Sequence, residues 1–139
     1  MSTQIALTIA AIASGLLTGF FLASASLLNL VLSSTAELRR IATRTAITVG
    51  ILGGIAALSA LGAIVNHLNA PDAMNVIGPV LVALALVVIG AGLGLFAAGN
   101  ARRDPNPPLL LRWKQSNWGA MAVSAAAFIL LLAAMNTLV

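Results

Sequence analysis

Residues 76–98 read VIGPVLVALALVVIGAGLGLFAA, a run of apolar and small residues that contains no charge. A helix needs about 20 such residues to cross the roughly 30 Å hydrocarbon core of a bilayer. The run shows no alternation of period two, and a backbone in lipid must satisfy its own hydrogen bonds. The run therefore predicts a transmembrane helix rather than a strand of a barrel.

Three more runs of this kind fill most of the chain. They predict helices over about 5–32, 37–65 and 117–138. Segment 34–37 reads STAE, the spacing of a capping box, which places the start of the second helix near Thr35. The predicted fold is all-α: an integral membrane four-helix bundle that forms a single transmembrane domain over residues 1–139.

The composition excludes several classes of protein. Only 7% of the residues are charged and 60% are hydrophobic, whereas soluble domains carry about 25% charged residues. Disordered chains are polar and highly charged, so disorder is excluded as well. The sequence pI of 11.7 reflects seven bases without Tyr or Cys rather than a basic face, so we expect no nucleic-acid partner. The absence of Cys excludes disulfides and thiolate metal sites.

The basic residues lie in two of the three connections between predicted helices. They are Arg39, Arg40 and Arg44 in the first, and Arg102, Arg103, Arg112 and Lys114 in the third. Because basic loops stay in the cytoplasm, both connections are predicted to be cytoplasmic and both termini external. Together with these seven basic residues, Trp113 and Trp118 are expected to anchor the chain among lipid headgroups, in a bacterial cytoplasmic (inner) membrane.

Glycine pairs with GxxxG spacing occur in three of the predicted helices. They are Gly15 with Gly19, Gly50 with Gly54, and Gly90 with Gly94. Small residues let two membrane helices approach closely, which replaces the missing hydrophobic drive for association. Such pairs can pack the chain's own bundle or a neighbouring subunit. Three pairs exceed what one small bundle needs, so we expect other integral membrane subunits or self-association.

Ionisable residues are absent from the centres of the predicted spans. The three acids, Glu37, Asp72 and Asp104, fall in loops or at helix ends, which argues against proton- or cation-coupled transport. His67 is the only histidine and is interpreted as a polar helix end. It could also ligate a haem or pigment, as a lone ligand unless a second subunit supplied another. We expect no metal and no cofactor.

Two short stretches resemble a known family. Residues 15–27, GLLTGFFLASASL, and residues 112–117, RWKQSN, are similar to the first and last helices of the anthrone-oxygenase-like family of small four-helix membrane proteins. Asn100 resembles an asparagine near the end of that family's third helix. The resemblance implies a four-helix membrane fold. The family pattern often places a histidine after the asparagine of the last helix, where this chain has Trp118.

Three functional hypotheses follow. The favoured one is a non-catalytic accessory or scaffold subunit that packs against larger membrane partners. The alternative is a cofactor-free oxygenase-like enzyme acting on an apolar aromatic substrate, for which the sequence offers no obvious base. The candidate pocket for this activity comprises Asn29, Asn100 and Asn117, beside Arg112 and Trp113. The third is an oligomeric pore or carrier, and its candidate lining comprises Ser14, Thr18, Ser24 and Ser26.

Overall fold

A computed structural model describes the backbone of most of the chain as four helices. The described backbone covers residues 2–30, 35–71, 73–103 and 107–137, and the described side chains cover 2–24, 40–71, 73–99 and 115–137. The helices are α1 (Thr3–Leu30), α2 (Thr35–His67), α3 (Ala73–Arg103) and α4 (Pro107–Thr137). Over these ranges the chain is all-helical, as predicted.

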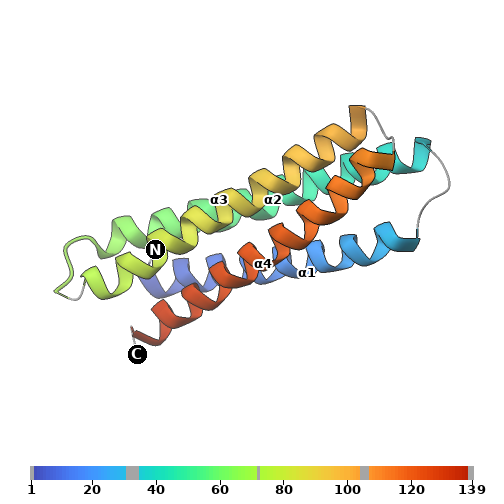
Figure 1. Ribbon diagram of the computed structural model, residues 1–139. Helices are drawn as coiled ribbons and strands as arrows, with labels where there is room; N and C mark the ends of the chain where they lie inside the picture. The colour runs from blue at the N-terminus through green and yellow to red at the C-terminus, as the bar shows by residue number, and fades with distance from the viewer. Residues whose placement is uncertain (1, 31–34, 72, 104–106, 138–139) are drawn as a thin grey trace.

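The four helices form a bundle in which neighbours along the chain run in opposite directions (Figure 1). α1 packs against α2 and α4, and α3 packs against the same two helices. Each helix therefore has two main neighbours, and the helices form a closed ring around the core. The N-terminus of α1, the C-terminus of α4 and the turn between α2 and α3 lie at one end of the bundle.

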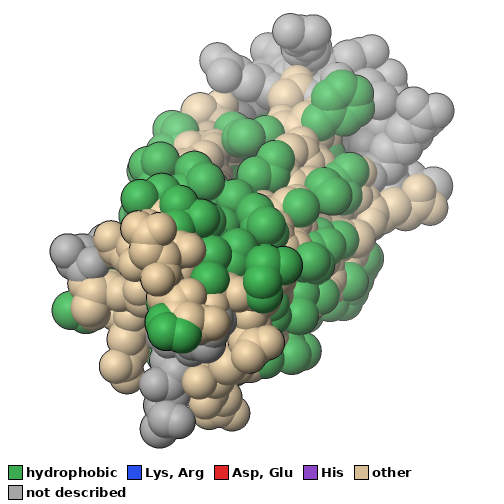
Figure 2. All heavy atoms as spheres, turned by 90° about the vertical axis from the view of Figure 1, so that its left-hand side faces the viewer, with side chains coloured by type: hydrophobic (Ala, Val, Ile, Leu, Met, Phe, Trp, Pro, Cys, Tyr) green, Lys and Arg blue, Asp and Glu red, His purple; other side chains and the backbone are tan. Residues whose placement is uncertain are grey.

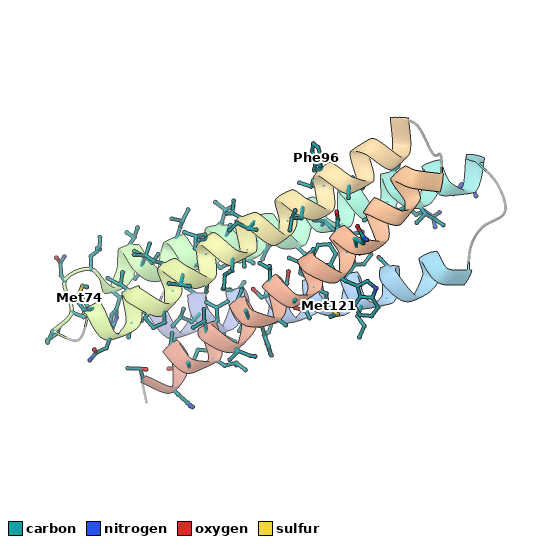
Figure 3. The ribbon with its side chains drawn as sticks, in the orientation of Figure 1. Met74, Phe96 and Met121 are labelled. Carbon is teal, nitrogen blue, oxygen red and sulfur yellow. The ribbon has the colours of Figure 1, made fainter. Side chains whose placement is uncertain are left out.

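Each helix contains a segment that is long and apolar enough to cross a membrane. The segments are Thr3–Ser24, Arg40–His67, Ala73–Gly99 and Gln115–Thr137. Large apolar side chains such as Leu58 and Phe96 are about 70% exposed. Figure 3 shows Phe96 projecting outward from α3. Hydrophobic side chains also cover much of the described surface on the face that Figure 2 shows. An apolar surface of this extent indicates an integral membrane protein, because lipid can cover it and water cannot.

Helices α2, α3 and α4 are longer than the apolar runs that predict them. α2 begins at Thr35, where the capping-box spacing places it, and its 33 residues span about 50 Å. α4 begins at Pro107 rather than near residue 117, and α3 continues to Arg103 rather than ending near 98. Pro107 and Pro108 are tolerated in the first turn because the first N–H groups of a helix have no intrahelical acceptor. Helices of this length extend beyond the hydrocarbon core or tilt within it.

The interior is built mainly of small side chains. One core cluster joins Leu7, Val76 and Leu131 with alanines from all four helices. A second cluster joins Leu17, Phe21, Val49 and Ala120. Small side chains bring the helix backbones close together, so the bundle is held by dispersion contacts rather than by large interlocking residues.

Local hydrogen bonds define the end of the bundle that carries the chain termini. The Ile5 backbone N–H donates to Ser2 Oγ over 3.2 Å, which caps the first turn of α1. The Ala70 N–H donates to the His67 carbonyl, and the Ala73 N–H donates to the Ala70 carbonyl. These two bonds carry the chain through the short turn from α2 to α3.

Candidate functional site

The glycine pair of α3 faces the interior of the bundle. A Cβ built at Gly94 would lie 2.7 Å from the ring of Phe21 in α1. A Cβ built at Gly90 would lie 2.9 Å from Ser124 Oγ and 3.4 Å from the Ala120 carbonyl oxygen in α4. The separations of 2.7 Å and 2.9 Å are shorter than a normal van der Waals contact, so these two positions let α3 approach its neighbours.

The glycine pair of α2 has the opposite orientation. Gly50 and Gly54 are exposed, and no neighbouring atom lies within 4 Å of a Cβ built at either position. The glycine between them that does face inward is Gly53, where a Cβ would lie 2.9 Å from Ala91 Cβ of α3. Ile51 and Ile55, both exposed, follow the two outward glycines directly. We call Gly50, Ile51, Gly54 and Ile55 the outer face of α2.

The two glycines of the α1 pair face different environments. A Cβ at Gly15 would lie 3.1 Å from the Phe128 ring of α4, so this glycine faces the bundle. Gly19 is exposed and has nothing within 4 Å of its Cβ position. The same spacing in three helices therefore gives three different arrangements.

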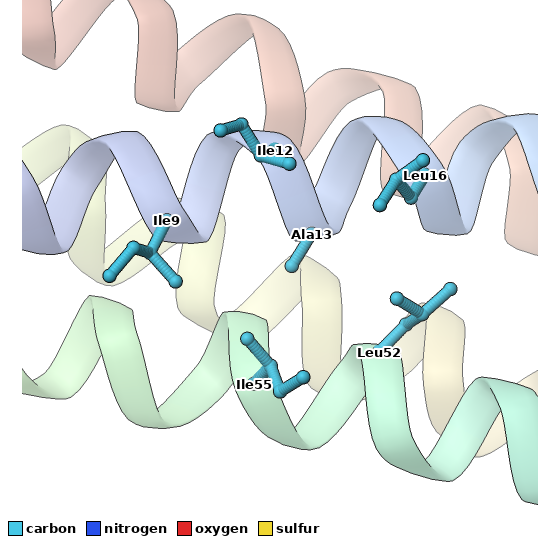
Figure 4. A pocket seen from close by; sticks show the side chains of 6 residues that line it. All are labelled: Ile9, Ile12, Ala13, Leu16, Leu52 and Ile55. Atoms are coloured by element: carbon cyan, nitrogen blue, oxygen red, sulfur yellow. The ribbon is translucent and has the colours of Figure 1, made fainter.

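An apolar groove runs along the outside of the bundle between α1 and α2 (Figure 4). Its volume is about 210 Å³, and it is lined by Ile9, Ile12, Ala13, Leu16, Leu52 and Ile55. None of these side chains can donate or accept a hydrogen bond. The groove therefore suits a lipid acyl chain better than a polar substrate.

Asn117 is the most unusual polar residue in the described interior. Its side chain is fully buried, and neither Nδ2 nor Oδ1 has a hydrogen-bond partner. Ser14 Oγ and Ser124 Oγ are also buried without a partner. A helical hydroxyl often donates to the carbonyl four residues earlier, as Thr18 Oγ1 does to the Ser14 carbonyl over 2.9 Å. The two serines do not use this bond.

Three buried polar side chains lie toward the end of the bundle where α2 begins. They are Ser24, Thr45 and Asn117, and we call them the polar level. Each lies one helical turn from a member of the cluster that contains Phe21, Val49 and Ala120. Because α1 runs opposite to α2 and α4, these three steps lead toward the same end of the bundle.

The structure describes only part of the predicted site. The side chains of Asn29, Asn100, Arg112 and Trp113 lie outside the described residues, as do those of Ser26, Arg39, Arg102, Arg103 and Lys114. The three acids also lie outside the described side chains. Of the candidate pocket, Asn117 alone can be placed, and it faces the interior. Thr45 was missed by sequence reasoning because it follows Arg44 directly, at a helix end that reads as polar.

The described charged and interfacial residues lie toward the helix ends. Arg40 and Arg44 are exposed in the first turns of α2, and Trp118 is 45% exposed on α4. His67 is buried at the other end of α2. Among the described residues, no group of three or more His, Cys, Asp or Glu side chains is placed to hold a metal ion.

Two of the serines proposed as a pore lining face the interior of the bundle. Ser14 and Ser24 are buried, and the side chains of Leu17 and Phe21 fill the space between their levels. A pore formed between several copies of the chain would need polar groups on an outer surface. These two serines are therefore not placed to line it.

Comparisons with known proteins do not extend this description. No family model, curated protein or solved structure matches the chain.

Proposed function

We propose that the chain is a non-catalytic accessory subunit of a membrane assembly, and that a transmembrane helix of a partner packs on the outer face of α2. The observation that carries the proposal is the orientation of Gly50 and Gly54. Both are turned away from the bundle, and neither would bring a Cβ within 4 Å of another atom. Glycines at these positions do nothing for the packing of the chain itself.

The outer face of α2 has the shape that close helix packing requires. Two glycines one turn apart leave a shallow depression along the helix, and Ile51 and Ile55 form a ridge beside it. A second helix can bring its backbone against the glycines while the branched side chains pack along its flank. The resulting dispersion contacts and weak Cα–H···O contacts need no charged or polar side chain.

The distribution of ionisable groups supports a structural role rather than catalysis. Among the described side chains, these groups are Arg40, Arg44 and His67, all near the ends of α2. Among the described residues, no ionisable side chain is buried near the end of the bundle that holds Asn117, where the oxygenase hypothesis needs a base. The accessory role is therefore the better supported of the two.

The test is a comparison of two double variants of the full-length chain. The variant Gly50→Leu with Gly54→Leu fills the depression on α2. The control, Gly92→Leu with Gly119→Leu, places the same side chains at two other glycines that have nothing within 4 Å. After purification in a mild detergent, the amounts of co-purifying membrane proteins are measured by quantitative mass spectrometry.

In the α2 double variant, we expect the amount of at least one co-purifying membrane protein to fall about tenfold. This fall is equivalent to about 1.4 kcal/mol of binding free energy. The control should retain it. A stable monomer without partners in the unaltered chain would refute the proposal, as would equal loss of partners in both variants.

We also propose that both ends of the chain and the α2–α3 turn lie outside the cell, with the arginine-bearing end of α2 in the cytoplasm. The chain has no cysteine, so single cysteines can be introduced without removing any. Asn69→Cys and Thr137→Cys should react with a membrane-impermeant maleimide on intact cells. Arg40→Cys should react only after the cells are permeabilised. The reverse pattern would contradict this topology.

A further inference from the structure

The amide of Asn117 lacks the bonds that a buried amide normally makes. The side chain is 0% exposed, with a donor at Nδ2 and an acceptor at Oδ1 both unpartnered. Burying such groups without hydrogen bonds is costly, and the cost is largest where no water competes. Buried polar groups are therefore nearly always bonded, either to the protein or to an ordered small molecule.

Other buried side chains toward this end of the bundle are small or polar. α1 and α2 contribute the buried hydroxyl residues Ser24 and Thr45. One turn beyond Gly94, α3 contributes Ala97 and Ala98, both buried. The ring of Phe21 packs over Gly94, one turn before these alanines. Small buried side chains in this part of the bundle, together with an unpartnered amide, favour a small bound polar group.

The described side chains at this end of the bundle favour an uncharged bound group. The described cations nearest to this level in sequence, Arg40 and Arg44, are exposed and lie on the surface of α2. The described basic residues place no buried positive charge at this end of the bundle. Among the described residues, a buried phosphate or carboxylate would therefore find no ion-pair partner, which is strongly unfavourable.

The hydrogen-bonding pattern of the amide limits further which chemical group can be bound. A ketone or ether oxygen accepts but cannot donate, so it would leave Asn117 Oδ1 unpartnered. A hydroxyl group both donates and accepts, and it is the smallest uncharged group that satisfies Nδ2 and Oδ1 together. We propose that the polar level binds a hydroxyl group, held by Asn117 with Ser24 and Thr45 beside it.

Two sources can supply this hydroxyl: a water molecule, or the polar end of a hydroxylated lipophile that enters from the membrane. The proposal does not depend on the accessory role, because the polar level faces the interior and the outer face of α2 faces away from it. Failure of one proposal therefore leaves the other intact.

The experiment uses the full-length chain in phosphatidylcholine nanodiscs, since this lipid has no hydroxyl group. The asparagine side chains are labelled with ¹⁵N, and the Asn117 resonance is identified by its loss in Asn117→Ala. Magnetisation transfer from the Asn117 amide protons is then measured to water, to added 1-decanol, and to decane as the control without a hydroxyl.

A cross-peak to water alone identifies water as the occupant, and a cross-peak to the C1 methylene of 1-decanol identifies a lipophile. Decane should give no cross-peak. If neither water nor 1-decanol gives a cross-peak, the proposal is overturned. Thermal unfolding gives an independent readout. If the amide holds a hydroxyl group, Asn117→Val should lower the midpoint of thermal unfolding. If the amide has no bound group, this variant should be more stable than the unaltered chain, because it removes unpartnered polar atoms from the interior.

Discussion

Replacing Phe21 by alanine is expected to lower the free energy of unfolding by about 2–3 kcal/mol. Phe21 is the largest fully buried side chain of the described interior, and its ring occupies the space above Gly94. Moving a ring into lipid costs little, so the effect comes mainly from the cavity left behind. At about 24 cal/mol per Å³ and about 100 Å³ of lost volume, the cavity accounts for this figure. Unfolding with sodium dodecyl sulfate in bicelles would measure the change.

Phe96→Ala is the matched control for this prediction. Phe96 projects from α3 and is 72% exposed (Figure 3), so its loss should change the free energy of unfolding by less than about 0.5 kcal/mol. A double-mutant cycle adds a second check. Gly94→Ala should destabilise the unaltered chain and be tolerated beside Phe21→Ala, with a coupling of about 1 kcal/mol or more. Equal losses for Phe21→Ala and Phe96→Ala would contradict the packing described.

Gly53→Ala is expected to destabilise the bundle by about 1–3 kcal/mol, whereas Gly54→Ala should leave its stability almost unchanged. At Gly53 the new Cβ would lie 2.9 Å from Ala91 Cβ, an atom fixed to the backbone of α3. The two helices must therefore move apart. At Gly54 nothing lies within 4 Å, and the higher helix propensity of alanine is the main effect. Unfolding curves of the two single variants would show the difference.

Rescue provides the decisive control for the Gly53 prediction. Ala91→Gly removes the methyl group that the new Cβ meets, so it should restore most of the stability that Gly53→Ala loses. Equal destabilisation by Gly53→Ala and Gly54→Ala would show that the two glycines do not face different environments. Comparing these two adjacent residues thus distinguishes a contact within the chain, at Gly53, from a surface that can contact a partner, at Gly54.

The apolar spans could be predicted from the sequence because long uncharged runs have few alternatives in lipid. The run at 76–98 lies wholly within α3. The extensions of α3 to Arg103 and of α4 back to Pro107 could not be predicted in this way. Hydropathy measures compatibility with lipid, whereas these extensions depend on helical hydrogen bonds that charged residues and first-turn prolines do not prevent.

The orientation of each helix about its axis could not be predicted from spacing either. Gly50 with Gly54 and Gly90 with Gly94 have the same spacing, yet the first pair faces outward and the second faces inward. In water the polar face of a helix reveals its exposed side, but in lipid both faces are apolar and that signal disappears. The polar level was missed as a group for a related reason, since its members come from three helices far apart in the sequence.

The contact between α1 and α4 determines when the fold can be completed during synthesis. These helices are the first and last of the four, and they pack side by side, with Gly15 of α1 against Phe128 of α4. One flank of α1 therefore stays uncovered by the bundle until α4 has been synthesised, and contacts this distant in sequence form late. During that interval the α4 of another copy presents the same surface to α1. Exchange of α4 between copies synthesised close together is thus the characteristic misassembly of this ring of helices.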